Sequence, residues 1–165
     1  RNPISRFVSA FNWRYQLVVE DGTQKSDYHG ERELLEKYKN ANDLAEGIYN
    51  EKNELIIDFQ REQFYIHHLK EDINFYIGDL LKNCKKKNIR AVLATESLND
   101  DLKRHFDITL KSHLKKNAKR THLSLKAVNN LVKYFEKDYY CIERLNEMGL
   151  LTENQYKNLS NKTFN

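Results

Sequence analysis

Residues 1–11 read RNPISRFVSAF, and this stretch combines a helix start with a pattern of basic and hydroxyl side chains. Asn2 suits the N-cap position because its side-chain oxygen can accept a hydrogen bond from a backbone N–H of the first turn. Pro3 suits the first helical position, since its φ angle is already helical and the N–H that it lacks would have no partner there. We therefore predict a helix that begins at Pro3.

The predicted helix has two faces that do not mix. At 3.6 residues per turn, one face collects the apolar side chains of Ile4, Phe7, Phe11, Tyr15 and Val18. The opposite face carries Asn2, Arg6, Ser9 and Trp13, with Arg1 just before it. We expect the apolar face to pack on a sheet and the polar face to meet an anion, attracted by the free N–H groups and positive end of the helix.

The pattern R-N-P-x-x-R-x-x-S-x-F resembles the 3′-phosphate-binding motif of sulfotransferases that use 3′-phosphoadenosine-5′-phosphosulfate (PAPS), in their carbohydrate branch. The resemblance implies that Arg1 and Ser9 hold the 3′-phosphate of PAPS and that Arg6 braces the loop. The alternative is an ordinary amphipathic helix in which the arginine and the serine have no such role.

Two later segments resemble the same branch in the same order. Residues 89–101, IRAVLATESLNDD, look like the strand and the E-[ST]-L-x-x-D turn that follow the phosphate motif in these enzymes. Within that turn, Glu96 is expected to hydrogen-bond its own backbone. Residues 131–139, LVKYFEKDY, are similar to the closing helix of the family, where an aromatic pair precedes an acid and another aromatic. The resemblance therefore covers most of residues 1–147.

Residues 89–95 form the one clear strand candidate, a short β-branched run. Amphipathic patterns predict longer helices at residues 69–84 and 128–145, the second closed by Met148-Gly149. Because one strand cannot form a sheet, and such sheets bind ligands at their carboxyl edge, we expect further sequence before Arg1.

The resemblance implies an α/β fold, and this chain would be the C-terminal portion of a P-loop-like three-layer sulfotransferase domain, mostly helical in this portion with one clear strand near residues 89–95. Residues 1–165 would then be a single partial domain without its N-terminal phosphosulfate-binding part. Residues 150–165 are expected to form a polar tail.

The resemblance also implies a reaction, the transfer of a sulfuryl group from PAPS to an acceptor hydroxyl, on a carbohydrate in this branch. The catalytic base is expected in the part before Arg1, so that residues 1–165 alone would be inactive. Within the chain, His68 of the His67-His68 pair is a secondary candidate for the base, because an imidazole titrates near neutral pH. Its core-like neighbours favour a packed or substrate-lining role instead.

A late basic cluster is the other candidate contact with the nucleotide. It contains Lys116, Lys119 and Arg120, at a place where sulfotransferases often close a basic loop over the nucleotide. A plain exposed basic loop is the alternative. The rival class of function is a helical module that binds nucleic acid or another polyanion without catalysis. Because the aromatic side chains fall on apolar helical faces and acidic residues dilute most basic faces, we expect no nucleic-acid partner.

The composition of the chain gives expectations for its cellular compartment and for bound metals. The chain has 165 residues and a net charge of +4, and no stretch approaches the roughly 20 apolar residues of a membrane span. Cys84 and Cys141 lie far apart without metal-ligand spacing, so we expect buried free thiols, no metal and a reducing compartment. The cytoplasm is the expected location, with the Golgi lumen as the alternative for a eukaryotic type II membrane protein.

Overall fold

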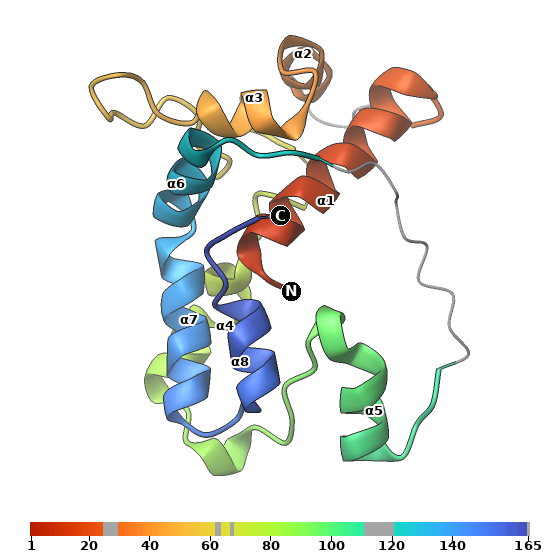
Figure 1. The fold of residues 1–165 in the computed structure, drawn as a ribbon, viewed down its shortest axis with the longest axis vertical. Coiled ribbons are helices and arrows are strands. Elements are labelled where there is room, and N and C mark those ends of the chain that lie inside the picture. Colours follow the sequence, from red (N-terminus) through yellow and green to blue (C-terminus); the bar gives the residue numbers. More distant parts are fainter. Residues whose placement is uncertain (25–29, 62–63, 67, 111–120, 165) are drawn as a thin grey trace.

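The computed structural model describes residues 1–24, 30–61, 64–66, 68–110 and 121–164, and this part of the chain is mainly helical (Figure 1). Its α-helices are α1 (Pro3–Tyr15), α2 (Glu31–Lys37), α3 (Ala41–Glu46), α4 (Ile73–Asn83), α5 (Leu98–Phe106), α6 (Leu125–Tyr134), α7 (Glu136–Glu147) and α8 (Glu153–Leu159). A π-helical segment, Gln16–Glu20, continues α1, and two short 3-10 helices lie at Lys86–Asn88 and Thr95–Ser97.

The α/β fold implied by the resemblance is wrong. The described residues form no sheet, and strand pairing among them is limited to one isolated antiparallel bridge between Tyr49 and Leu55. The described part of the chain is therefore mainly helical, as expected for this portion, but it lacks the strand that an α/β domain requires.

The strand predicted at residues 89–95 does not form, although Ile89 and Ala94 have extended backbone angles. Side chains, instead of a neighbouring strand, bond this backbone. The Gln155 amide donates to the carbonyl of Val92 at 3.0 Å, and the Asp101 carboxylate accepts from the N–H of Ala94 at 2.9 Å. A β-branched run becomes a strand only where a second strand pairs with it, and none does so in the described part of the chain.

Helix α1 begins at Pro3, as predicted from residues 1–11. The Asn2 side chain accepts a hydrogen bond from the N–H of Ser5 at 3.1 Å, which satisfies one donor of the first turn. The predicted apolar face is buried, with Ile4, Phe7, Phe11 and Val18 almost inaccessible. Its partners are helices, since α1 packs against α2, α3 and α6 where a sheet was expected.

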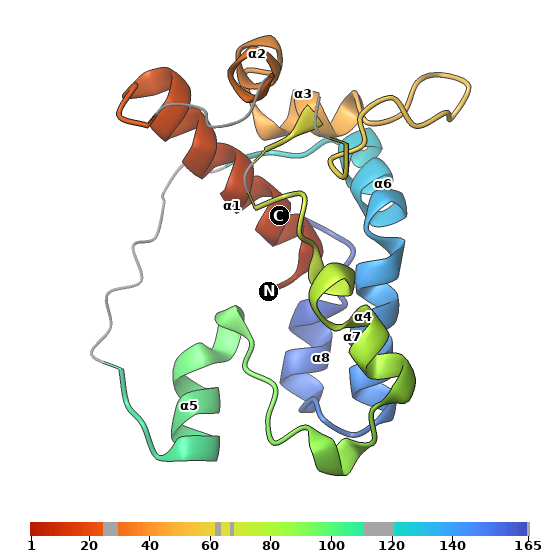
Figure 2. The same cartoon turned by 180° about the vertical axis from the view of Figure 1, so that it is seen from behind.

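Helices α6 and α7 follow one another along one side of the molecule, and α4 and α8 pack against α7 (Figures 1 and 2). The single helix predicted at residues 128–145 is broken at Phe135, whose ψ angle is 24°. The ring of Phe135 is buried beside Phe7 of α1, at 6.4 Å between centroids, so packing in the core holds the break. Helix α7 ends before Gly149, which has a φ of 64° and so provides the left-handed residue predicted there.

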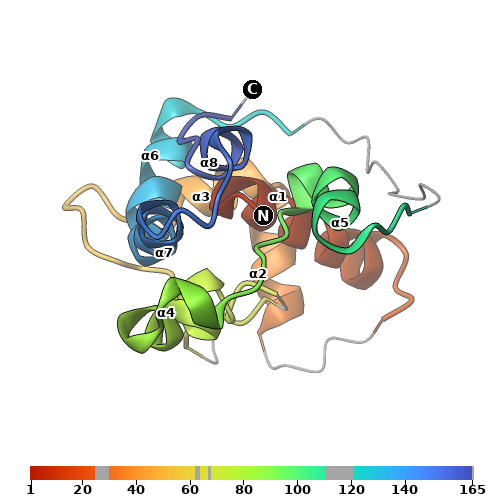
Figure 3. The same cartoon turned by 90° about the horizontal axis from the view of Figure 1, so that it is seen from below.

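Helix α5 lies on the far side of the molecule from α4 and α7 (Figure 3). Residues 153–159, within the stretch expected to be a polar tail, form α8 and bury Gln155 and Leu159. Helix α8 thus brings the last part of the chain close to the start of α1, where the candidate site lies.

Candidate anion-binding site

A pocket of about 460 Å³ lies beside the N-terminal half of α1, and we call it the Arg1 pocket. Its lining comes from four segments that are distant in sequence: the start of the chain with α1, the residue His68, the start of α4, and the 3-10 helix at Thr95–Ser97. The lining residues are Arg1, Arg6, Ser9, Ala10, Trp13, His68, Asp72, Ile73, Tyr76 and Thr95.

Arg1 and Ser9, the two residues expected to hold a phosphate, both line this pocket. Arg1 is exposed, and neither its guanidinium nor the Ser9 hydroxyl forms a hydrogen bond or ion pair with another described residue. These donors are therefore available to a ligand. Two cationic or hydroxyl donors that converge on one concave surface are suited to an anion with several acceptor oxygens.

Arg6 contributes a second guanidinium to the pocket. One of its nitrogens, Nη2, donates to the carbonyl of Glu71 and so ties α1 to the segment that leads into α4. The other nitrogen, Nη1, is buried and has no hydrogen-bond partner among the described residues. A buried donor without a partner is costly, so a ligand oxygen that reached Nη1 would bind to a group already stripped of water.

Asn2 anchors the N-terminus of α1 and so holds the backbone that adjoins Arg1. Its backbone N–H donates to Glu96 Oε1 at 2.9 Å. Its side-chain amide donates to the carbonyls of Asn158, Leu159 and Asn161, at 3.3, 3.0 and 2.8 Å. Glu96 therefore bonds a residue 94 positions away, and the expectation that it bonds its own turn is wrong. The local sequence predicts only the helix-cap role of Asn2, because its other partners lie 94 or more residues away along the chain.

Asp138 lies buried beneath the site, where α7 meets the start of α4. Its Oδ1 accepts from the N–H of Asn74 at 2.8 Å, while Oδ2 has no partner among the described residues. Burial raises the pKa of this carboxyl to about 6, and the bond from Asn74 and the charge of Arg6 oppose that rise. The first helix, α4 and α7 thus meet around a carboxyl that titrates in the mildly acidic range.

Aromatic and imidazole side chains complete the wall of the pocket. Trp13 is 41% exposed and Tyr76 is 63% exposed, and the Tyr76 hydroxyl donates to Glu71 Oε2 at 2.5 Å. His68 has a φ of 74°, a left-handed conformation that is uncommon for a residue with a side chain. His68 therefore reaches the pocket from a constrained turn, while His67 lies outside the described residues.

The remaining predicted site residues, Lys116, Lys119 and Arg120, lie outside the described residues. Cys84 and Cys141 are both free, but only Cys141 is buried as expected, because Cys84 lies half-buried at the end of α4. Burial raises the pKa of the Cys141 thiol to about 11. Within the described ranges, no three His, Cys, Asp or Glu side chains gather as metal ligands would. No helix formed by those residues has the length and apolar character to cross a membrane.

Searches against protein-family models, curated proteins and solved structures found no match to this chain.

Proposed function

We propose that this protein is a PAPS-dependent sulfotransferase and that the Arg1 pocket holds the 3′-phosphate of the donor nucleotide. The observation that carries the proposal is the convergence of Arg1, Arg6 and Ser9 on one pocket, with the donors of Arg1 and Ser9 uncommitted among the described residues. The helical fold is compatible with this function, because the same site chemistry can occur on different folds.

The charges around the pocket favour a phosphate. Two guanidinium groups line it, and a guanidinium matches two phosphate oxygens through paired N–H donors. The carboxylate that also lines it, Asp72, is committed to the start of α4, where its Oδ1 accepts from the N–H of Phe75 at 2.7 Å. Asp72 therefore opposes an anion less than its charge alone suggests.

Binding of the 3′-phosphate would contribute to catalysis by holding the donor nucleotide in the correct orientation. In sulfuryl transfer the acceptor oxygen attacks sulfur in line with the departing phosphate, so the donor must be held in one orientation. Arg1 and Ser9 supply that orientation and move no proton. For the acceptor we propose a carbohydrate hydroxyl, since the exposed ring of Trp13 offers a flat surface against which a sugar can pack. The free thiols suit a reducing compartment, and we propose the cytoplasm.

The test is the binding of adenosine 3′,5′-bisphosphate, which carries the 3′-phosphate of PAPS without the sulfuryl group. At a concentration 100 times its Kd it should stabilise the protein by about 2.7 kcal/mol, measured as a rise in thermal unfolding temperature. Replacing Arg1 with Ala should weaken binding about 10- to 100-fold, because a charged hydrogen-bond donor to phosphate is lost.

Arg144→Ala is the matched control, since Arg144 is an arginine of α7 that pairs with Glu147 and does not line the pocket. Its affinity should equal that of the unmodified protein. Equal affinity in Arg1→Ala would contradict the proposal. Stabilisation by polyuridylate, without any by the bisphosphate, would indicate the nucleic-acid-binding class instead.

A further inference from the structure

A closed set of hydrogen bonds, which we call the ring, includes Asn2 at the N-terminus of α1. The residues that form these bonds do not line the Arg1 pocket. One side of the ring is the bond from the Asn2 N–H to Glu96. The opposite side is the set of bonds from the Asn2 amide to carbonyls at the end of α8. Asn2 is 4% exposed, so its own donor groups are largely shielded from water, whereas Glu96 is exposed.

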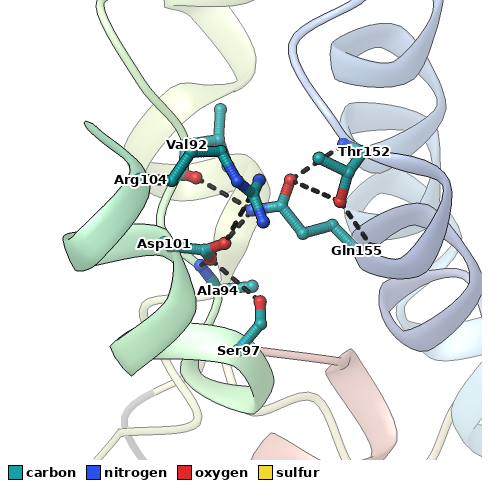
Figure 4. Close-up of polar contacts among 7 residues, drawn as sticks. All are labelled: Val92, Ala94, Ser97, Asp101, Arg104, Thr152 and Gln155. Atoms are coloured by element: carbon teal, nitrogen blue, oxygen red, sulfur yellow. Dashed lines mark hydrogen bonds and ion pairs between the residues drawn. The ribbon is translucent and has the colours of Figure 1, made fainter.

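The second half of the ring joins α8 to residues 92–101, which we call the Glu96 turn (Figure 4). Asp101 Oδ2 accepts three hydrogen bonds, from Ala94 N–H, Ser97 Oγ and Gln155 Nε2, at 2.9, 2.9 and 2.8 Å. The same Gln155 nitrogen donates to the carbonyl of Val92 at 3.0 Å. Asp101 and Gln155 are almost wholly buried, so this connection between α5, α8 and the turn is well protected.

The ring closes through the backbone. Gln155 and Leu159 belong to one helix, and Ser97 follows Glu96 directly. Asn2 is therefore bonded to both α8 and the Glu96 turn, and these two segments are bonded to each other. A movement of either segment would displace Asn2. Arg1 precedes Asn2, and Thr95, which precedes Glu96, lines the Arg1 pocket. The ring thus holds the pocket wall at Arg1 and the pocket wall at Thr95 in a defined position relative to each other.

We propose that Glu96 and Gln155 are positioning residues for the phosphate site, acting through Asn2 and the Glu96 turn on Arg1. This inference rests on the proposed function of the Arg1 pocket. Glu96 is exposed and is not one of the residues that line the pocket, and its hydrogen bond is the one that it accepts from the Asn2 N–H. Sites that bind through several donors at once lose affinity when one donor is displaced by a fraction of an ångström.

The experiment compares two nucleotides in the same variants. Trp13 is the single tryptophan of the chain and lines the pocket, so its fluorescence can report binding. In Glu96→Ala the Kd for adenosine 3′,5′-bisphosphate should rise about 5- to 10-fold, while the Kd for adenosine 5′-phosphate stays within about twofold. Gln155→Leu should have the same selective effect. Glu96→Gln should restore affinity, because its amide oxygen still accepts from Asn2.

Glu147→Ala is the matched control, an exposed glutamate of α7 that pairs with Arg144, and its affinities should not change. Circular dichroism and thermal unfolding will show whether Gln155→Leu is folded. If it is not, the two variants at exposed Glu96 are sufficient for the test. Unchanged bisphosphate affinity in the Glu96 variants would overturn the inference, as would an equal loss for both nucleotides. A wild-type protein without preference for the bisphosphate would overturn the proposed function and, with it, the inference.

Discussion

Asp138 is the residue whose charge state should matter most for stability. Its pKa is about 6 in the folded protein, against an ordinary value of 3.8, because burial disfavours the carboxylate. The folded state therefore holds this proton more tightly than the unfolded state. The resulting stabilisation is complete below pH 3.8 and is lost as the pH rises through 6, by up to about 3 kcal/mol. In Asp138→Asn that dependence should disappear, as measured by urea unfolding at pH 4, 5, 6 and 7. Asp79→Asn is the control, since Lys82 lowers the pKa of exposed Asp79. Identical pH profiles for the wild type and Asp138→Asn would refute this account.

Helices α3 and α6 depend on each other at their ends, through one serine. Ser124 caps α6 by accepting from the N–H of Ala127 at 3.1 Å, and its hydroxyl donates to Glu46 of α3 at 2.6 Å. This bond also lowers the pKa of Glu46. Ser124→Ala removes both contacts and should cost about 1–2 kcal/mol in the free energy of unfolding, measured by chemical denaturation. Ser124→Thr retains a hydroxyl and should lose less than half of that. If the alanine variant were as stable as the wild type, the cap would be dispensable.

At the scale of the whole molecule, a buried ion pair links α1 to α2. Arg14 donates to both carboxylate oxygens of Glu31, at 2.9 and 2.8 Å, and the Glu31 side chain is inaccessible to water. Glu31→Gln removes the negative charge from this buried pair and should cost about 3–5 kcal/mol of stability, measured by thermal and urea unfolding. The exposed pair of Arg32 and Glu36 on the same helix provides the comparison, and Glu36→Gln should cost at most about 1 kcal/mol. Similar losses in the two variants would contradict the dependence on burial.

Local sequence was enough to predict the features that one helix or one turn controls. The start of α1 at Pro3, its buried apolar face and the helix end at Gly149 all follow from periodicity and from the backbone preferences of single residues. The same periodicity placed Arg6 and Ser9 on one face, and the structure brings both into the Arg1 pocket. Free Cys84 and Cys141 followed from the absence of ligand spacing in the sequence.

The tertiary structure alone decided which distant groups bond to each other. Residues 89–95 have the composition of a strand, yet they pair with the side chains of Gln155 and Asp101, because a strand requires a partner that the local sequence does not specify. The long-range bond between Asn2 and Glu96, and the entry of His68 into the pocket, depend likewise on how helices pack. The sequence by itself determined the donors of the candidate site, since they share one helix face. Only the packing of α4, His68 and the Glu96 turn around that face decided the shape of the pocket.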